Sequence, residues 1–384
     1  MPYPGLKFSS EQRQMLDSLH ALLGEALPPE KLLELDEAYG DPVEAYQALA
    51  DAGWLGLMFS EDYGGYSGSY RDIAVLIEAL GFHSLSIATA YQCSTVFAGS
   101  YIQSFGSEQM KRRLIPEIIS GATRLAIAYT EPHAGSDVAA IRTRAKRDGN
   151  DYVINGQKCY ISCAHVADYI AVAVKTDPDA GRKGISMVLV DTTLPGVDIR
   201  PMKSLGRHAS RINDVFLDDV HVPADMLIGE ENAAWKMMMK GLNLERLVLA
   251  AGSCGVCMKA IRVAKDFAEN RSAFGSNIME YQGVSHKLAE MQILAHTSRL
   301  HTYHVAEQMD AGEKPIIETS IAKTYATVAM ATCTDLGLQI MGGQGYVAGE
   351  MERMFRDARL GTIGGGTSDI MRNVIAAQMK DLYP

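Results

Sequence analysis

A long segment that is apolar on every side of a helix constrains this chain more than any other feature. The segment Gly241–Gly275 reads GLNLERLVLAAGSCGVCMKAIRVAKDFAENRSAFG. Apolar residues recur at helical spacing on one face (Leu244, Leu247, Val248 and Ala251) and also on the opposite face (Leu242, Leu249, Gly252 and Val256). A helix without a polar face has to be covered all round, so the pattern predicts a fully buried helix.

One carboxylate, Glu245, falls near the start of this buried helix. Burial strips hydration from a carboxylate. The side chain therefore either pairs with a cation such as Arg246, or acquires a raised pKa that suits a general base. Both interpretations stay open on this segment alone, because structural ion pairs also perturb carboxylates.

Composition limits the classes of protein to which the chain can belong. With 384 residues it is expected to form two or three domains, and 47% hydrophobic with 21% charged residues is ordinary for a soluble globular protein. The net charge of -10 argues against nucleic acid or an anionic membrane surface as the main partner. We see no apolar run long enough to span a bilayer and no targeting segment, so we expect a cytoplasmic protein.

The six cysteines are too few for a disulfide framework in a chain of this length. Cys254 and Cys257 form a CxxC motif, which could hold a metal or a redox disulfide. The motif lies inside the apolar helix and has no second cysteine pair at zinc-ribbon spacing. We therefore expect these residues to serve helix packing.

Periodicity divides the chain into helical, β and helical parts. Residues 10–121 are helical in pattern, with helix starts indicated at Asp41-Pro42 and Ser107. Seven short runs rich in Val, Ile and Tyr follow, at 125–129, 142–146, 152–154, 169–174, 186–190, 197–201 and 214–222, and predict an antiparallel barrel or sandwich. Helices are expected again at 234–270, 283–311, 316–341 and 366–381, as a four-helix bundle. The predicted domains are 1–123, 124–232 and 233–384.

Motifs for phosphate loops, zinc proteases, α/β-hydrolases and dinucleotide-binding Rossmann domains are missing from the sequence. Two other stretches stand out. Thr130–Asp137 (TEPHAGSD) forms a polar loop after a strand, which could hold a ligand or be a surface turn. Gly361–Asp369 (GTIGGGTSD) places three glycines before the last helix, where backbone amides could bind a phosphate or a carbonyl oxygen. An ordinary capped helix start explains that stretch equally well.

Six short motifs together resemble the acyl-CoA dehydrogenase flavoprotein family. They are AYTEPHAGSD at 128–137, NGQK at 155–158, RSAFG at 271–275, QIMGGQGY at 339–346, RDA at 356–358 and GTS at 366–368. Their order and spacing are family-like from about Ser10 to the C-terminus. The resemblance implies an N-terminal helical domain, a central β-domain and a C-terminal four-helix bundle, with FAD bound between the last two, usually in a homotetramer.

The resemblance also implies cofactor and substrate contacts, residue by residue. FAD would contact Ile127, Tyr129, Thr130, Ser136, Tyr160, Ile161 and Ser162 of the β-domain. Its dinucleotide part would be bound across a subunit interface by Arg271, Phe274, Gln282, Gln339, Gly342 and Gly343, and its pyrophosphate would meet Thr367, Ser368 and Asp369. The substrate would contact Ser136, Asn243, Arg246, Gly365 and Gly366. Tyr160 and Asn243 depart from the tryptophan and aspartate that are frequent in the family.

Many family members carry their catalytic glutamate directly before the Gly-Thr pair, where this chain has Gly365. Isovaleryl-CoA and long-chain acyl-CoA dehydrogenases instead use a glutamate in the helix that here contains Glu245. A glycine at 365 avoids two repelling carboxylates and clears room for a base from another helix. The resemblance thus implies that Glu245 removes the α-proton, that flavin N5 takes the β-hydride, and that the Gly365 N–H polarises the thioester carbonyl.

An electron-transfer flavoprotein would then accept the electrons. Three alternatives remain at this point. The thioester could be tethered to a carrier protein, the enzyme could be a monooxygenase or resemble nitroalkane oxidase, or the protein could be a non-catalytic scaffold of the same fold.

Overall fold

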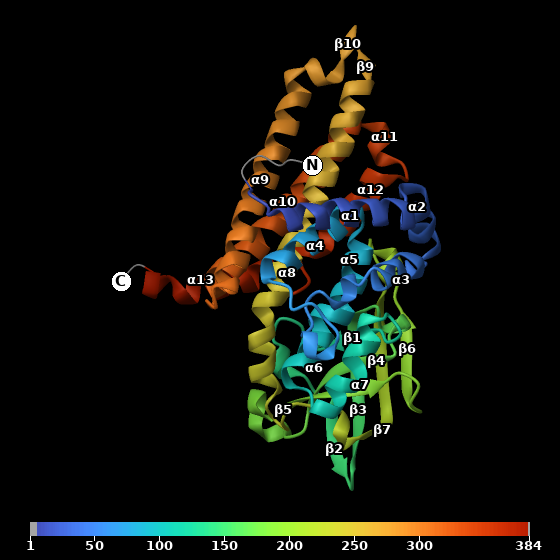
Figure 1. Cartoon of the computed structure of the whole chain (residues 1–384), viewed down its shortest axis with the longest axis vertical. Coiled ribbons are helices and arrows are strands. Elements are labelled where there is room, and N and C mark those ends of the chain that lie inside the picture. The colour runs from blue at the N-terminus through green and yellow to red at the C-terminus, as the bar shows by residue number, and fades with distance from the viewer. Residues whose placement is uncertain (1–5, 383–384) are drawn as a thin grey trace.

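The computed structural model describes residues 6–382, which form a helical N-terminal part, a β-domain and a helical C-terminal part (Figure 1). The N-terminal helices are α1 (Ser10–Ala26), α2 (Pro29–Ala38), α3 (Val43–Asp51), α4 (Tyr70–His83), α5 (Leu85–Tyr91), α6 (Ser100–Phe105) and α7 (Glu108–Ile119). The helix starts predicted at Asp41-Pro42 and Ser107 are confirmed. Pro42 precedes α3, and the Ser107 hydroxyl accepts a hydrogen bond from the Met110 N–H at the start of α7.

Eight strands form one sheet below these helices. They are β1 (Leu125–Ala128), β2 (Arg144–Asp148), β3 (Asp151–Ser162), β4 (Tyr169–Lys175), β5 (Ile185–Asp191), β6 (Val197–Pro201), β7 (Ile212–Pro223) and β8 (Leu227–Ile228). Their order is β6-β7-β3-β2-β4-β5-β8, with β1 paired to β4. The central β-domain is confirmed, but the sheet is not purely antiparallel, because β1 and β2 each run parallel to β4. Strands that are not consecutive have the long connections that parallel pairing requires.

Strand β3 is longer than the sequence pattern predicts. The expected run covered only Tyr152–Ile154, and the segment Asn155–Lys158 that follows it is polar. Pairing with β7 nevertheless continues to Ser162, through register shifts at Ile154/Gly156 and Lys158/Ile161. Bulges of this kind re-aim side chains, and the second one leaves Tyr160 with a positive φ of 60° and an exposed ring.

The C-terminal part contains α8 (Ala234–Asn270), α9 (Gln282–Asp310), α10 (Ile316–Met341), α11 (Gly343–Tyr346), α12 (Glu350–Ala358) and α13 (Ser368–Leu382), with a small hairpin of β9 (Ser272–Ala273) and β10 (Ser276–Asn277). Two features differ from the prediction. Helix α12 was not expected, and α13 projects away from the body instead of lying along the bundle (Figure 1). Ser368 and Met371 in its first turn are buried, whereas Ala376, Ala377 and Met379 are exposed.

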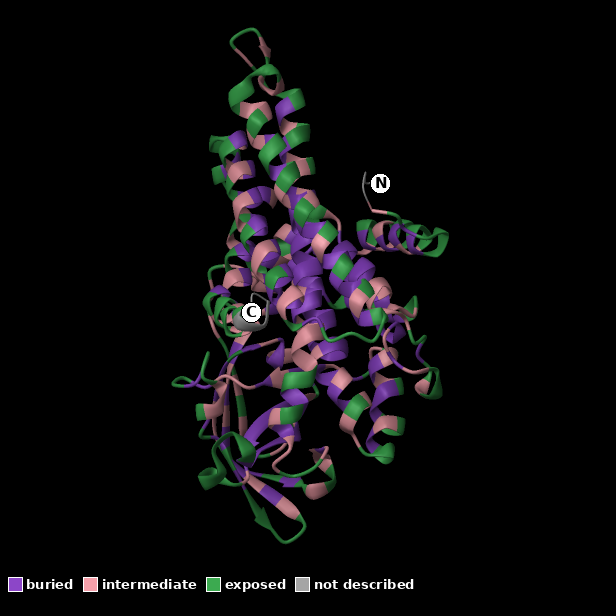
Figure 2. Ribbon diagram, turned by 90° about the vertical axis from the view of Figure 1, so that its left-hand side faces the viewer, coloured by how far each residue is buried: buried purple, intermediate pink, exposed green. Residues whose placement is uncertain are grey.

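Helix α8 is the buried core helix that its apolar pattern predicted. The backbones of α8 and α4 touch, because glycines lie where the two helices cross. A Cβ on Gly255 of α8 would lie 2.1 Å from the Glu78 carbonyl oxygen of α4. A Cβ on Gly81 of α4 would lie 2.3 Å from the Gly252 carbonyl oxygen of α8. Cys254 and Cys257 are free and buried in this region, as expected for packing residues. Figure 2 shows buried residues concentrated along the inner faces of the bundle and the sheet.

Helix α8 is also the one described helix that is long and apolar enough to cross a membrane by length and composition, so the expectation that no segment reaches that length was wrong. The apolar window within α8 is 72% buried inside the protein, so its composition is accounted for by packing against neighbouring helices.

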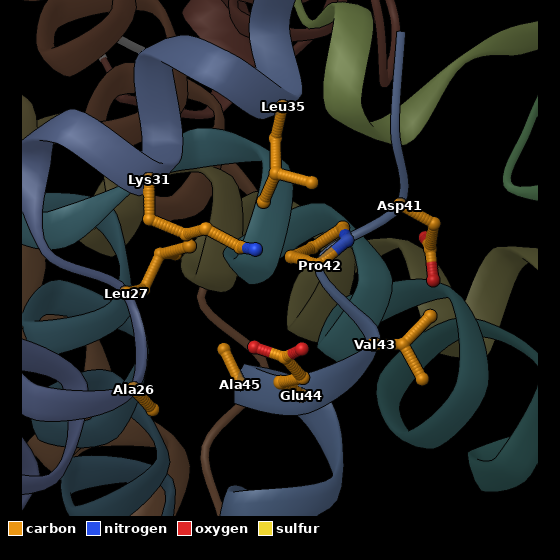
Figure 3. Close-up of a pocket in the computed structure, with 9 residues that line it drawn as sticks. All are labelled: Ala26, Leu27, Lys31, Leu35, Asp41, Pro42, Val43, Glu44 and Ala45. Carbon is orange, nitrogen blue, oxygen red and sulfur yellow. The ribbon is translucent and has the colours of Figure 1, made fainter. Parts of the chain in front are cut away.

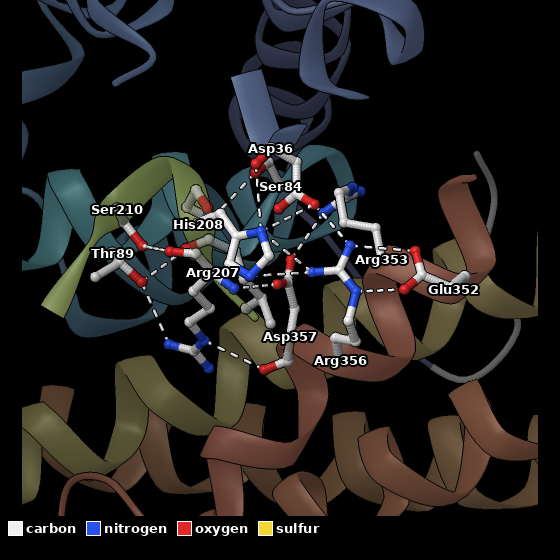
Figure 4. A network of polar contacts seen from close by, with 12 residues as sticks. Asp36, Ser84, Thr89, Arg207, His208, Ser210, Glu352, Arg353, Arg356 and Asp357 are labelled. Atoms are coloured by element: carbon white, nitrogen blue, oxygen red, sulfur yellow. Dashed lines mark hydrogen bonds and ion pairs between the residues drawn. The ribbon is translucent and has the colours of Figure 1, made fainter. Parts of the chain in front are cut away.

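A buried polar network joins the three parts of the chain (Figure 4). The Arg356 guanidinium on α12 donates to Asp36 on α2 at 2.6 Å, and Asp36 also contacts His208, which lies between β6 and β7. Beside it, Asp357 accepts hydrogen bonds from the Arg207 N–H and from Arg353. The Arg-Asp-Ala motif at 356–358 therefore holds the domains together.

Candidate active site

The structure brings Glu245 and Gly365 together from two segments that are far apart in the sequence. Gly365 lies in the turn before α13 with a φ of +63°, and Gly366 follows with a φ of +83°. A Cβ on Gly365 would lie 3.4 Å from Oε1 of Glu245 and 2.2 Å from Cδ1 of Leu249. Glu245 and Leu249 of α8 therefore both lie against the space that a side chain at 365 would need.

Burial raises the pKa of Glu245 above its ordinary value of 4.5. Arg246 on the same helix and Lys323 on α10 act in the opposite direction, but neither forms an ion pair with it among residues 6–382. A carboxylate that is poorly hydrated and not neutralised by a direct partner binds a proton more readily than one in water. A raised pKa is the property that suits a carboxylate to act as a general base.

Two tyrosines from other elements lie near enough to Glu245 for its charge to affect their pKa. Burial raises the pKa of Tyr101 on α6 and of Tyr129 directly after β1, the neighbouring Tyr101 raises the pKa of Tyr129 further, and the Glu245 carboxylate adds a smaller increase to both. The Tyr101 hydroxyl occupies the space beside Gly241, where a Cβ would lie only 2.4 Å from it. The Tyr129 hydroxyl is buried and makes no hydrogen bond of normal geometry within residues 6–382. Tyr101 was not among the predicted site residues, because it belongs to no recognisable motif.

The turn around Gly365 carries free backbone donors at the start of a helix. Within the described residues, the Gly365 N–H has no hydrogen-bond acceptor, while the Gly364 N–H donates to the Leu360 carbonyl at 2.9 Å. Thr367 caps α13 through its hydroxyl, which accepts from the Ile370 N–H at 3.1 Å. The Ser368 hydroxyl is buried without a partner in the same part of the chain. An unpaired amide and an unpaired hydroxyl at a helix N-terminus suit an oxygen-rich ligand.

The predicted substrate contacts Asn243 and Arg246 both reach from α8 to α10. Asn243 accepts a hydrogen bond from Thr319 at 3.2 Å, and Arg246 donates one to Ser320 at 3.3 Å. Arg246 is 5% exposed, and its Nε has no partner within residues 6–382. Its guanidinium therefore keeps a donor for a further acceptor.

A buried ion pair holds the loop that follows β1. The Lys158 ammonium contacts the Glu131 carboxylate at 2.7 Å, with the two side chains 0% and 2% exposed, and also donates to the Tyr129 carbonyl. Glu131 in turn accepts from the backbone N–H groups of Arg142 and Thr143. This pair positions Tyr129 and Thr130, while Ser136 further along the loop is exposed. Sequence reasoning noted the two motifs but assigned no role to Glu131 or Lys158.

The remaining residues expected to contact FAD fall into two groups. Ile127 is half-buried on β1, and Ile161 and Ser162 end β3 beside the exposed Tyr160. The second group, comprising Arg271, Phe274, Gln282, Gln339, Gly342 and Gly343, is exposed at the end of the bundle remote from the β-domain (Figure 1). Along α8, Glu245 and Arg271 are about 40 Å apart at the helical rise of ~1.5 Å per residue. One chain therefore does not bring this second group to Glu245.

A cavity of about 240 Å³ elsewhere contains none of the predicted site residues. It lies among α1, α2 and α3, where Lys31 and Glu44 extend toward each other (Figure 3). Asp41 on its rim is engaged by Arg124, so its carboxylate is not free for a ligand.

Comparisons with known proteins agree with this architecture along the whole chain. The N-terminal, middle and C-terminal domain models of the acyl-CoA dehydrogenase family match residues 9–122, 126–220 and 232–380. A cyclohex-1-ene-1-carbonyl-CoA dehydrogenase of Geobacter metallireducens is 36% identical over 381 residues, covering 98% of this chain and 99% of that protein. The CarC subunit of a caffeyl-CoA reductase-Etf complex of Acetobacterium woodii is 32% identical over 376 residues, covering 97% and 99%.

Among solved structures, an acyl-CoA dehydrogenase from Geobacillus kaustophilus superposes with a TM-score of 0.93 at 31% identity, covering 98% of this chain and 100% of that one. The matches extend through the segments that carry Glu245 and Gly365. The chain thus belongs to the acyl-CoA dehydrogenase family of FAD-dependent oxidoreductases.

Proposed function

We propose that this chain catalyses the α,β-dehydrogenation of an acyl-CoA thioester, with Glu245 as the catalytic base. The observation that supports it most directly is the position of the Glu245 carboxylate 3.4 Å from the Cβ that Gly365 lacks. The carboxylate thus lies close to a residue whose backbone N–H has no acceptor within the described residues, and proton removal next to a polarised carbonyl requires a base and a donor near each other.

Each residue of the proposed site has a separate role in the reaction. The Gly365 N–H donates to the thioester carbonyl and stabilises the negative charge that develops on it as the α-proton leaves. Glu245 accepts that proton, for which its raised pKa suits it. Bound FAD supplies the acceptor for the hydrogen that leaves the β-carbon with its electron pair. Arg246 keeps a buried donor for the polar part of the substrate.

The binding of FAD is supported by the unpaired polar groups of the site. The Tyr129 and Ser368 hydroxyls are buried and lack partners within the described chain, which is unfavourable unless a ligand pairs with them. We assign Ile127, Tyr129, Thr130, Ser136, Tyr160, Ile161 and Ser162 to the flavin side, and Thr367, Ser368 and Asp369 to its pyrophosphate. Arg271, Phe274, Gln282, Gln339, Gly342 and Gly343 would contact the FAD of a second copy of the chain, consistent with a homotetramer.

We further infer that an electron-transfer flavoprotein reoxidises the enzyme. Support comes from the 32% identical relative, whose name places it in a complex with such a protein. The acyl group is expected to be one that can carry an α,β double bond, as the names of both relatives indicate.

An anaerobic titration of the flavin absorbance tests the proposed function. Butyryl-CoA, isovaleryl-CoA and cyclohex-1-ene-1-carbonyl-CoA would each be added to the purified holoenzyme. Bleaching of the flavin by at least one ester is expected. A flavin that none of them bleaches, while the corresponding carrier-protein thioester does, would assign the tethered substrate instead.

A further inference from the structure

A lysine that no motif singles out lies fully buried beside the proposed base. Lys323 is on α10, is 0% exposed, and donates from Nζ to the Gly366 carbonyl at 2.6 Å. Among the side chains that the structure describes, which end at residue 379, it has no salt bridge to a carboxylate. Burying an ammonium group without a direct ion pair is costly, so a lysine at such a place calls for a reason other than stability.

The hydrogen bond from Lys323 holds one side of the Gly365 turn. The other side is held at Gly364, whose N–H donates to the Leu360 carbonyl. Gly365 lies between these two attachments in a backbone conformation with positive φ, and its N–H is free within the described residues. One helical turn further along α10, Thr327 packs against Gly361. A Cβ placed on Gly361 would lie 3.2 Å from the Cβ of Thr327. The same face of α10 therefore determines where the turn lies and where the Gly365 N–H points.

Lys323 also contributes charge to the site. Burial lowers its pKa to about 8, Glu245 raises it, and Arg246 and Arg207 lower it further. In return, the Lys323 charge lowers the pKa of Glu245. The other titratable groups facing Glu245 are Tyr101 on α6 and Tyr129 after β1, both of which stay protonated because burial raises their pKa. Lys323 and Arg246 are thus the cations that act on the base.

We propose that Lys323 is a positioning residue for the reaction at Glu245, because its ammonium fixes the Gly365–Gly366 turn through the Gly366 carbonyl and sets the charge beside the base. This inference rests on the proposed function. It adds a residue that acts through the turn and the base.

Two substitutions separate the hydrogen bond from the charge. Lys323→Met removes both, whereas Lys323→Gln keeps an amide donor and removes the charge. We expect Lys323→Met to retain FAD and to lower kcat about 100-fold, because displaced catalytic groups lose rate on that scale. Lys323→Gln should keep more of kcat than Lys323→Met does. In both variants the acid limb of the pH profile of kcat/KM should move to higher pH, since Glu245 loses a cation that favours its charged form.

A matched control is Thr334→Val on the same helix. Thr334 is 0% exposed and donates to the Met330 carbonyl within α10, so the change removes a buried polar group without touching the turn. Its kcat and its acid limb should equal those of the wild type. A structural role of Lys323 alone would lower FAD content or stability but leave the acid limb in place.

The outcomes are distinguishable. Wild-type kcat and an unmoved acid limb in Lys323→Met overturn this inference alone. If Lys323→Met does not fold, the acid limb of Lys323→Gln decides, with an upward shift supporting the inference and no shift overturning it. A wild-type flavin that no thioester bleaches overturns the proposed function and this inference with it.

Discussion

Oε1 of Glu245 lies 3.4 Å from the position that a Cβ on Gly365 would occupy. The two residues are on α8 and in the turn before α13. A side chain on Gly365 would contact the Glu245 carboxylate and would overlap Leu249, whose Cδ1 lies 2.2 Å from that Cβ position. Either position could present a base to the same substrate carbon, but two carboxylates in this space would repel each other. This relationship leads to the first two predictions.

Glu245→Gln should retain FAD and lose most turnover. The amide has the shape of the carboxylate but does not accept the α-proton, and loss of a general base typically lowers rates about 10²–10⁴-fold. Stopped-flow flavin reduction by the best thioester measures the effect, and the flavin spectrum of the purified variant shows whether the cofactor is bound. Near wild-type reduction would mean that another group is the base.

Moving the base to position 365, by Glu245→Ala with Gly365→Glu, should be limited by Leu249. A Cβ at 365 would lie 2.2 Å from Cδ1 of Leu249, and the φ of +63° disfavours any side chain there. Adding Leu249→Ala removes the clash. We expect the triple variant to recover more activity than the double variant, measured against Glu245→Ala. Equal activities of the double and triple variants would contradict the steric role of Leu249.

The rate of flavin reduction should fall as the pH is lowered. This fall should begin at a higher pH than it would if the base were a carboxylate of ordinary pKa. Glu245 must be deprotonated to act, and burial raises its pKa above 4.5. The acid limb of kcat/KM therefore reports its protonation in the free enzyme. An acid limb at or below 4.5, or one that persists in Glu245→Gln, would show that a different group titrates.

Tyr129→Phe should weaken FAD binding without destabilising the ligand-free protein. Removing an unpaired buried hydroxyl is expected to leave the apoprotein as stable as before or stabilise it by about 1 kcal/mol. If that hydroxyl pairs with the bound cofactor, FAD affinity should fall about tenfold. Thermal melting of the apoprotein and fluorescence titration with FAD measure the two effects.

Tyr303→Phe is the matched control. The Tyr303 hydroxyl is also buried without a hydrogen-bond partner in the described chain, but it lies beside Phe8 and Arg71, remote from the turn at Gly365. It should change apoprotein stability in the same way and leave FAD affinity unchanged. A tenfold loss of FAD affinity in both variants would contradict the assignment of the Tyr129 hydroxyl to FAD binding.

Asp357→Asn should weaken the junction of the three domains. Asp357 is 1% exposed and pairs with Arg353 at 2.8 Å while accepting from the Arg207 N–H. Breaking a buried pair leaves a cation uncompensated and lowers the free energy of unfolding by about 3–5 kcal/mol. Asp198→Asn breaks the exposed pair with Arg200 and should change the free energy of unfolding by less than about 1 kcal/mol. Urea denaturation compares the two, and equal effects would contradict the role of the network.

Only some of the predicted substrate and cofactor residues lie near one another within one chain. Glu245, Gly365, Gly366, Asn243 and Arg246 come together, with Tyr129 close by. The distal residues from Arg271 to Gly343 stay apart from them, because α8 and α9 extend well beyond the β-domain. The resemblance placed these residues across a subunit interface, and the distance along α8 is compatible with that prediction.

Local periodicity accounts for what the sequence could predict. The apolar faces of α8 predicted its burial, the Val- and Ile-rich runs at 169–174 and 186–190 predicted β4 and β5, and six short motifs between 128 and 368 indicated the family. Local pattern failed where pairing partners override it. The polar Asn155–Lys158 segment continues β3 because β7 supplies hydrogen bonds, and α13 leaves the bundle because only its first turn meets a buried surface.

The sequence by itself determined the order of the domains, the buried helix and the pairing of a glutamate at 245 with a glycine at 365. Only the tertiary structure decided that the Lys323 ammonium meets the Gly366 carbonyl, and that Tyr101 and Tyr129 face Glu245. The reason is physical. Helix and strand patterns arise from neighbours within a few residues, whereas the surroundings of a buried charge are set by side chains that come from distant segments and belong to no common motif.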